Sequence, residues 1–251
     1  MSAKTAVITG ASDGLGAHLA TRLAEEGWRV TGVGRRPHTE SSVPAGIDYV
    51  RLDLARPDAV EQLLDRLGET PDLVVQNAVS YPAPGDGAPS LTEMEDVFRV
   101  NALTPYRLAL GLLDRKPPEQ FVSCIVINSE SIYHADDGSG LYAASKAALR
   151  VLSTALATRY RSRNASVATL LLGPLADAKK VAQLRRIAEQ KGLSEQQVTA
   201  LFLRRSNPDL VIDQLIDFDS CHRSVAYLAG LGPVANGMLC RLDGGSAGSL
   251  I

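Results

Sequence analysis

The chain has 251 residues, of which 45% are hydrophobic and 22% are charged, so it is long enough and apolar enough to bury one large core. Its 26 lysines and arginines nearly balance 28 aspartates and glutamates, and the net charge of −2 gives no basis for nucleic acid or an anionic membrane as main partner. Three cysteines without paired or metal-ligand spacing indicate reduced thiols, so we expect a cytoplasmic protein without a metal site.

Short β-rich runs alternate with helical periods along the chain, which is typical of a parallel sheet with helices on both faces. The expected strands lie at 5–9, 29–33, 48–52, 73–75, 121–127, 167–172 and 238–242. Several of these runs are almost continuously apolar, as strands buried on both faces should be. The sequence therefore predicts an α/β fold, a doubly wound, parallel, seven-stranded sheet of the Rossmann type, within a single domain over 1–251.

Two segments depart from this alternation. Residues 80–90 are rich in proline and glycine, which predicts a loop. Residues 175–220 are more charged and more helical than their surroundings, and Ser194 and Gln197 form a capping-box pattern there. Since this stretch falls before the last expected strand, we interpret 175–220 as a helical insertion that covers the substrate.

A glycine-rich turn, TGASDGLG, follows the first expected strand and leads directly into a helix. Gly10, Gly14 and Gly16 permit a tight turn and let a pyrophosphate approach the backbone, while the helix N-terminus offers free N–H groups. A plain strand-to-helix turn is the simpler alternative. The strand before it and the helix after it favour dinucleotide binding.

The end of the second expected strand bears on which dinucleotide binds. NAD-preferring enzymes place a carboxylate there to bind the adenosine ribose. Here the position is Gly34, followed by Arg35 and Arg36, whose guanidinium groups can pair with a 2′-phosphate. This favours NADP, although Asp13 puts a negative charge in the phosphate loop and argues the other way.

Tyr142 and Lys146 lie four residues apart on an expected helix, so both project from one face. An ammonium beside a phenol stabilises the phenolate, so we expect Lys146 to lower the pKa of Tyr142 from its usual value of about 10. Such a tyrosine can exchange a proton near neutral pH. Ser129, at the end of a buried strand, can donate a hydrogen bond to a reacting oxygen. Downstream of a nucleotide loop, this set indicates a catalytic site.

With these motifs the chain resembles the compact, single-domain branch of the short-chain dehydrogenase/reductase family over essentially its whole length. The resemblance implies strand order 3-2-1-4-5-6-7 and catalytic roles for Asn101, Ser129, Tyr142 and Lys146; Ser131 competes with Ser129, whose separation from the tyrosine fits the family better. It implies cofactor contacts by Gly10, Ser12, Asp13, Gly14, Leu15, Gly16, Arg35, Arg36, Asp53, Leu54, Asn77, Ala78, Tyr142, Lys146, Gly173 and Pro174.

The function that the resemblance implies is an NADPH-dependent ketoreductase, which transfers hydride to a carbonyl of a small-molecule or an acyl or polyketide-type substrate. In that role Tyr142 protonates the carbonyl oxygen and Ser129 positions it. Lys146 holds the nicotinamide ribose, and Asn101 anchors a water that links this lysine to solvent. The alternatives are an NAD-dependent alcohol dehydrogenase working oxidatively and a non-catalytic dinucleotide sensor. A homodimer or homotetramer is implied as well, with helices at 93–113 and 141–161 in the interfaces.

Some residues leave the family pattern or stay undecided. Val79 replaces a glycine beside the cofactor, and Gly173-Pro174 reverses the usual Pro-Gly with no threonine before Thr199. His134, Asp136 and Asp137 are interpreted as loop residues rather than substrate ligands. Glu130 and Tyr81 are left open as pocket residues.

Overall fold

A computed structural model describes residues 3–82, 88–134 and 138–246 of the chain. The strands are β1 (Thr5–Thr9), β2 (Arg29–Gly34), β3 (Asp48–Arg51), β4 (Leu73–Gln76), β5 (Val122–Ser129), β6 (Ala165–Leu172) and β7 (Leu239–Leu242). The α-helices are α1 (Gly14–Glu25), α2 (Ala59–Leu67), α3 (Leu91–Phe98), α4 (Thr104–Arg115), α5 (Gly140–Arg159), α6 (Ala178–Lys191), α7 (Glu195–Ser206) and α8 (Phe218–Gly230). Among the helices in the described ranges, none combines the length and apolar character needed to cross a bilayer.

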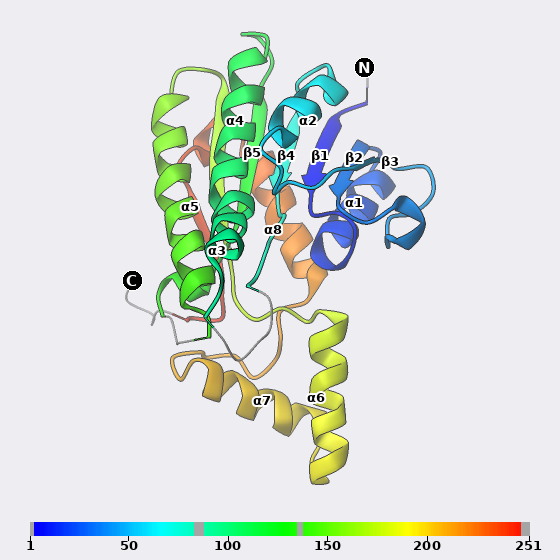
Figure 1. Cartoon of the computed structure of the whole chain (residues 1–251), viewed down its shortest axis with the longest axis vertical. Coiled ribbons are helices and arrows are strands. Elements are labelled where there is room, and N and C mark those ends of the chain that lie inside the picture. Colours follow the sequence, from blue (N-terminus) through cyan, green and yellow to red (C-terminus); the bar gives the residue numbers. More distant parts are fainter. Residues whose placement is uncertain (1–2, 83–87, 135–137, 247–251) are drawn as a thin grey trace.

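The seven strands form one parallel sheet in the order β3-β2-β1-β4-β5-β6-β7, which confirms the predicted fold (Figure 1). Parallel neighbours require a crossover connection between them, and the helices supply it. The connection after β1 leads to β2 on one side, and the connection after β4 leads to β5 on the other, so the sheet has a topological switch point between β1 and β4. Ligands of open α/β sheets bind at such a switch point.

Alternate residues of the central strands bury into two separate cores. In β1, Ala6 and Ile8 pack with α1 and α8, whereas Val7 packs with α2 and α4 on the other face. In β6, Leu170 belongs to the first core and Val167 to the second. Figure 1 shows α4 and α5 lying together over that second face. Burial of both faces explains why the strands read as continuous apolar runs.

In the structure, the helix expected at 93–113 changes from α-helical to π-helical geometry at one turn. A π-helical turn, η2 (Arg99–Leu103), separates α3 from α4 and contains Asn101. Pro105, at the start of α4, has no N–H with which to donate the α-helical hydrogen bond to the carbonyl of Asn101. The expected helix is thus present throughout 93–113, with a π-helical turn rather than a break at the position where Asn101 enters the site.

The insertion expected at 175–220 contains α6 and α7, which project beyond the carboxyl end of the sheet (Figure 1). Its two ends run side by side: Ile216 donates its N–H to the carbonyl of Pro174 at 2.9 Å, and Ala176 donates to Ile216 at 2.9 Å. The two helices share a small core of their own around Leu184 and Val198. The insertion is thus joined to the sheet through a hydrogen-bonded stem.

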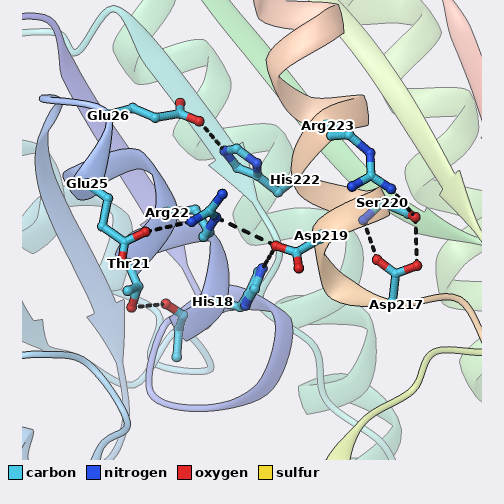
Figure 2. Close-up of polar contacts among 11 residues, drawn as sticks. His18, Thr21, Arg22, Glu25, Glu26, Asp217, Asp219, Ser220, His222 and Arg223 are labelled. Atoms are coloured by element: carbon cyan, nitrogen blue, oxygen red, sulfur yellow. Dashed lines mark hydrogen bonds and ion pairs between the residues drawn. The ribbon is translucent and has the colours of Figure 1, made fainter.

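Helix α8, which follows the insertion, is fastened to α1 by charged side chains (Figure 2). Asp219 lies 3.1 Å from His18 and 3.6 Å from Arg22 of α1. A second contact joins His222 of α8 to the carboxylate of Glu26, the residue that follows α1, at 3.1 Å. These pairs connect the end of the insertion to the helix that begins at the glycine-rich turn.

Replacement of Leu170 by alanine is expected to lower the free energy of unfolding by about 2–5 kcal/mol, because this fully buried side chain of β6 would leave a cavity. Urea unfolding followed by circular dichroism measures the change. Leu201→Ala is the matched control, since Leu201 on α7 is 58% exposed, and equal losses in the two variants would contradict the assigned core.

Candidate active site

The glycine-rich turn packs tightly against the end of β4. A Cβ on Gly10 would lie 2.7 Å from Ala78, and one on Gly16 would lie 2.6 Å from the amide nitrogen of Asn77. The same amide nitrogen donates to the carbonyl of Gly10 at 3.3 Å. Gly14 differs, because a Cβ there would meet nothing within 4 Å. Gly10 and Gly16 therefore allow close packing, and the N-terminus of α1 stays open at Gly14.

A cleft of about 760 Å³ opens in front of this turn. The predicted cofactor residues that line it are Gly10, Ser12, Asp13, Gly14, Leu15, Arg35, Arg36, Asp53, Leu54, Asn77 and Ala78. Val79, expected beside the cofactor, also lines it, and wall residues that were not predicted include Ser80, Leu175, Lys179 and Phe218. The cleft thus runs from the ends of β2 and β3, past the N-terminus of α1, to the first turn of α6.

The chemistry of this cleft fits a nicotinamide dinucleotide. An open helix N-terminus presents N–H groups and a partial positive charge to a pyrophosphate. Arg35, Arg36 and Lys179 add cationic groups, while Leu15, Leu54 and Val79 supply apolar wall for the rings. A volume of about 760 Å³ lies within the usual range for cofactor sites.

One carboxylate lies among the cleft's basic groups. Asp13 caps α1 by accepting the N–H of Gly14 at 2.8 Å, and its other oxygen accepts from Arg36 at 3.1 Å. The Gly14 N–H lowers the pKa of Asp13, and Arg36 and Lys179 lower it further. Asp13 therefore stays ionised and holds Arg36 across the cleft.

Close packing explains the absence of a carboxylate at the end of β2. A Cβ on Gly34 would lie 2.9 Å from the Cβ of Ser12 and would also collide with the hydroxyl of Tyr49. Contacts this short do not occur in folded proteins unless a neighbour such as Ser12 or Tyr49 shifts. The acidic side chain that NAD-preferring enzymes place at this position does not fit here.

The groups expected to react gather at the carboxyl end of β5. Ser129 ends this strand, and its hydroxyl oxygen accepts from the N–H of Ser131 at 3.3 Å and from the Ser131 hydroxyl at 2.8 Å. Ser129 also lies close enough to the hydroxyl of Tyr142 on α5 to lower the pKa of that phenol. Of the two serines, Ser129 is thus the one beside Tyr142, and Ser131 holds the Ser129 hydroxyl in place.

Lys146 lies one turn beyond Tyr142 and is buried. Its ammonium donates to the carbonyl of Ile127 at 3.1 Å and lies 6.0 Å from the centre of the Tyr142 ring. Burial lowers the pKa of Lys146 from 10.5 to about 8. The lysine is therefore close to the tyrosine, but it donates an N–H to the Ile127 carbonyl of β5.

The expected effect of Lys146 on Tyr142 is wrong in direction for this structure. Burial raises the pKa of Tyr142, and the neighbouring Tyr81 and Glu130 raise it further, while Ser129 lowers it. Since the Lys146 ammonium is engaged by Ile127, desolvation of the phenol dominates. Tyr142 thus holds its proton at neutral pH.

Asn101 joins the cleft to the reacting groups. Its fully buried amide accepts the N–H of Ser80 at 2.7 Å and donates to the Ser80 carbonyl at 2.8 Å. It also donates to the hydroxyl of Ser145 at 2.9 Å, which donates to the backbone carbonyl of Tyr142 at 2.6 Å. The side chain of Asn101 therefore joins a loop to α5, and its expected role in anchoring a water stays a prediction.

Comparison with known proteins assigns the family. The family described as short chain dehydrogenase matches residues 4–186. The chain belongs to the short-chain dehydrogenase family. The uncharacterized oxidoreductase YvaG of Bacillus subtilis (strain 168) is 27% identical over 258 residues, which cover 98% of this chain and 96% of that protein.

Solved structures share the fold. A 4-hydroxyisoleucine dehydrogenase complexed with NADH has a TM-score of 0.80 and 18% identity, covering 98% of this chain and 100% of its own. BdcA in complex with NADPH has a TM-score of 0.77 and 22% identity, covering 98% of this chain and 95% of its own. Members of the short-chain dehydrogenase fold with either dinucleotide thus resemble this chain.

Five of the residues expected to contact the cofactor of this short-chain dehydrogenase do not line the cleft: Gly16, Tyr142, Lys146, Gly173 and Pro174. Gly16 lies behind the turn, and Gly173 packs against the backbone of Asp243. The backbone carbonyl of Pro174 is used by the stem of the insertion. Cofactor contacts by these residues remain predictions. Asp136 and Asp137 lie outside the described residues.

Sequence reasoning missed Lys179 as a cleft residue and left Glu130 and Tyr81 open. Lys179 reaches the cleft from α6, and the basic pattern of that helix was its only signal. Glu130 is buried and contacts His134 in the loop after β5. Tyr81, left undecided from the sequence, stacks on Tyr142 with ring centres 4.6 Å apart. These placements depend on how distant loops meet, which no local pattern reports.

Replacement of Lys146 by methionine tests the buried charge. The cost of burying the ammonium is present in full below pH 8 and disappears as the pH rises from about 8 to 10.5, because the folded protein then releases a proton that the unfolded chain keeps. Lys146→Met should raise the free energy of unfolding by roughly 3 kcal/mol at pH 7 and by much less at pH 10. Urea titrations measure both, with the exposed Lys191→Met as control; an equal gain at both pH values would contradict the explanation.

Proposed function

We propose that this short-chain dehydrogenase is an NADPH-dependent ketoreductase acting on a small-molecule carbonyl. The observation that carries the proposal is that Ser129 and Tyr142 come together at the end of β5, close enough for the serine to lower the pKa of the phenol, with Lys146 beside them. The segment that lines the dinucleotide cleft at 78–80 continues directly to Tyr81 over this cluster. In the proposed enzyme, the dinucleotide cleft and this proton donor work as one site.

In the proposed reaction, the bound dinucleotide supplies hydride to the carbonyl carbon. Tyr142 donates its hydroxyl proton to the carbonyl oxygen as negative charge develops there. Ser129 orients that oxygen, and its own position is fixed by the N–H and hydroxyl of Ser131. Lys146 would bind the ribose next to the nicotinamide.

The protonation state of Tyr142 supports the reductive direction. Burial and its neighbours raise the pKa of this phenol, so it holds a proton that it can deliver to a carbonyl. An oxidising alcohol dehydrogenase needs a proton acceptor in the same place, and a desolvated neutral phenol is a poor one. The retained Tyr142 and Lys146 also favour an enzyme over a non-catalytic sensor.

Arg35 and Arg36 support the choice of NADPH, because both line the cleft at the end of β2 and the packing of Gly34 excludes a ribose-binding carboxylate. Asp13 supports the alternative NAD enzyme, since its carboxylate occupies Arg36 and would repel a 2′-phosphate. The excess of cationic groups, with Lys179 added, favours NADPH. BdcA is a fold relative solved with that dinucleotide.

The setting of the protein is part of the same proposal. We expect a cytoplasmic protein that forms a homodimer or homotetramer. The assembly is supported by exposed apolar side chains: Leu103, just before α4, is 51% exposed, and Val151 of α5 is 70% exposed. An acyl or polyketide-type ketone is a candidate substrate, and α6 and α7 would cover it. Size-exclusion chromatography with light scattering tests the assembly.

Loss of the Tyr142 hydroxyl should abolish most of the activity. We expect Tyr142→Phe to lower kcat by about 10²- to 10⁴-fold, the usual contribution of a general acid. The assay follows NADPH oxidation against a panel containing ethyl acetoacetate, cyclohexanone and a 3-oxoacyl thioester. Tyr227→Phe, at a residue 53% exposed on α8, serves as the control. Wild-type turnover by Tyr142→Phe would refute the proposal.

Removing the charge of Arg35 and removing the charge of Asp13 are expected to change the affinity for NADPH in opposite directions. Arg35→Ala should raise the Kd for NADPH by about 10- to 100-fold, because it removes a charge-assisted hydrogen bond to the 2′-phosphate, and should leave NADH unchanged. Asp13→Asn keeps the helix cap and should tighten NADPH binding. Fluorescence titration measures both, with Arg204→Ala as a surface control. Unaltered NADPH affinity in Arg35→Ala would overturn the cofactor assignment.

A further inference from the structure

Lys179 brings a positive charge to the dinucleotide cleft from outside the sheet. It is the second residue of α6, it is exposed, and it lines the cleft together with Asp13 and Gly14 at the N-terminus of α1. Lys179 also lowers the pKa of the Asp13 carboxyl, as a nearby cation does. The side chain of Lys179 and the start of α1 thus face the same part of the cleft.

The next lysine along the helix is used differently. The ammonium of Lys180 lies 4.5 Å from the centre of the Phe202 ring on α7, and it donates to the side-chain oxygen of Gln183 at 3.2 Å. In the described part of the chain, no hydrogen bond or ion pair of this kind engages the ammonium of Lys179. Lys180 therefore holds α6 on α7, while Lys179 keeps its charge available to the cleft.

The cations of the cleft approach the start of α1 from opposite sides of β1. Arg35 and Arg36 follow β2, whereas Lys179 follows β6, and β2 and β6 lie on different sides of β1 in the sheet. The adenosine ribose of a dinucleotide is expected at the end of β2, and its diphosphate at the start of the first helix. Lys179 is therefore on the far side of the diphosphate position from the arginines.

We propose that Lys179 binds the diphosphate of the dinucleotide opposite the N-terminus of α1, and that Arg35 binds the 2′-phosphate of NADPH. The inference rests on the proposed dinucleotide cleft, and it adds a cofactor ligand from the helical insertion. An ammonium is a compact charge that suits a phosphate oxygen, and a helix N-terminus attracts the same group. Since NADPH and NADH share the diphosphate, Lys179 binds both. It adds to the preference for NADPH only by offsetting the charge of Asp13.

Removal of the Lys179 charge should weaken both dinucleotides. In Lys179→Met, the Kd for NADPH and the Kd for NADH should each rise about 3- to 30-fold, the range for a charged hydrogen bond that solvent partly screens. The fragment 2′-AMP carries a 2′-phosphate but no diphosphate, so its Kd should not change. Isothermal titration calorimetry measures all three without turnover. Arg35→Ala should instead weaken NADPH and 2′-AMP and leave NADH unchanged.

Lys191→Met is the matched control, because it removes the same charge from the other end of the same helix. Helix α6 runs away from the sheet (Figure 1), and Lys191 lies about 18 Å along it from Lys179. This distance exceeds the screening length of about 8 Å at physiological salt. The control should therefore leave the three Kd values unchanged. Lys179→Arg keeps a charge at the cleft and should bind both dinucleotides more tightly than Lys179→Met does.

The pattern of binding separates the failure of this inference from the failure of the proposed function. Unchanged Kd values in Lys179→Met would overturn the inference, and so would a loss confined to NADPH and 2′-AMP, which would put the lysine at the 2′-phosphate. Equal losses in Lys191→Met would overturn it as well. A protein that binds both dinucleotides but reduces no ketone would refute only the ketoreductase. A wild type that binds neither dinucleotide would refute the cleft and the inference together.

Discussion

The fully buried amide of Asn101 is the interaction on which the rest of the site depends. Its oxygen and nitrogen bind the backbone of Ser80 and the hydroxyl of Ser145, so that a loop after β4 and the helix α5 are held by one side chain. The π-helical turn η2 places this amide there, and Pro105 explains why α-helical hydrogen bonding is interrupted at that point. An unpaired amide at this depth would destabilise the fold, so the N–H and carbonyl of Ser80 and the hydroxyl of Ser145 are held together around it.

Burial then sets the chemistry of the reacting groups. The same low-polarity surroundings lower the pKa of Lys146 to about 8 and raise the pKa of Tyr142, because each environment disfavours the charged form. Lys146 donates to the Ile127 carbonyl and leaves the tyrosine protonated. The site is therefore arranged to hold a proton on Tyr142, which agrees with a role as donor rather than acceptor.

The cleft beside these groups combines opposite charges. Asp13 binds Arg36 across the front of α1, at the place where a phosphate group would be attracted by the helix terminus. Lys179 reaches the same cleft from α6, so the insertion contributes to the dinucleotide region as well as to the proposed cover of the substrate. The stem at Pro174 and Ile216 fixes the position of that helix relative to the sheet.

The sequence by itself determined the strands of the parallel sheet and the glycine-rich turn, because apolar runs, helical periods and glycine spacing are local properties of the chain. The order of the strands came from the family resemblance, and the structure confirms it. It also singled out Ser129, Tyr142 and Lys146 from their spacing, although their roles remain proposals. The tertiary structure alone decided that Tyr81 covers Tyr142 and that the pKa of this tyrosine is raised rather than lowered. Both facts arise where loops from different strands meet in a desolvated space, and neither burial nor the direction of a hydrogen bond is encoded in residue spacing.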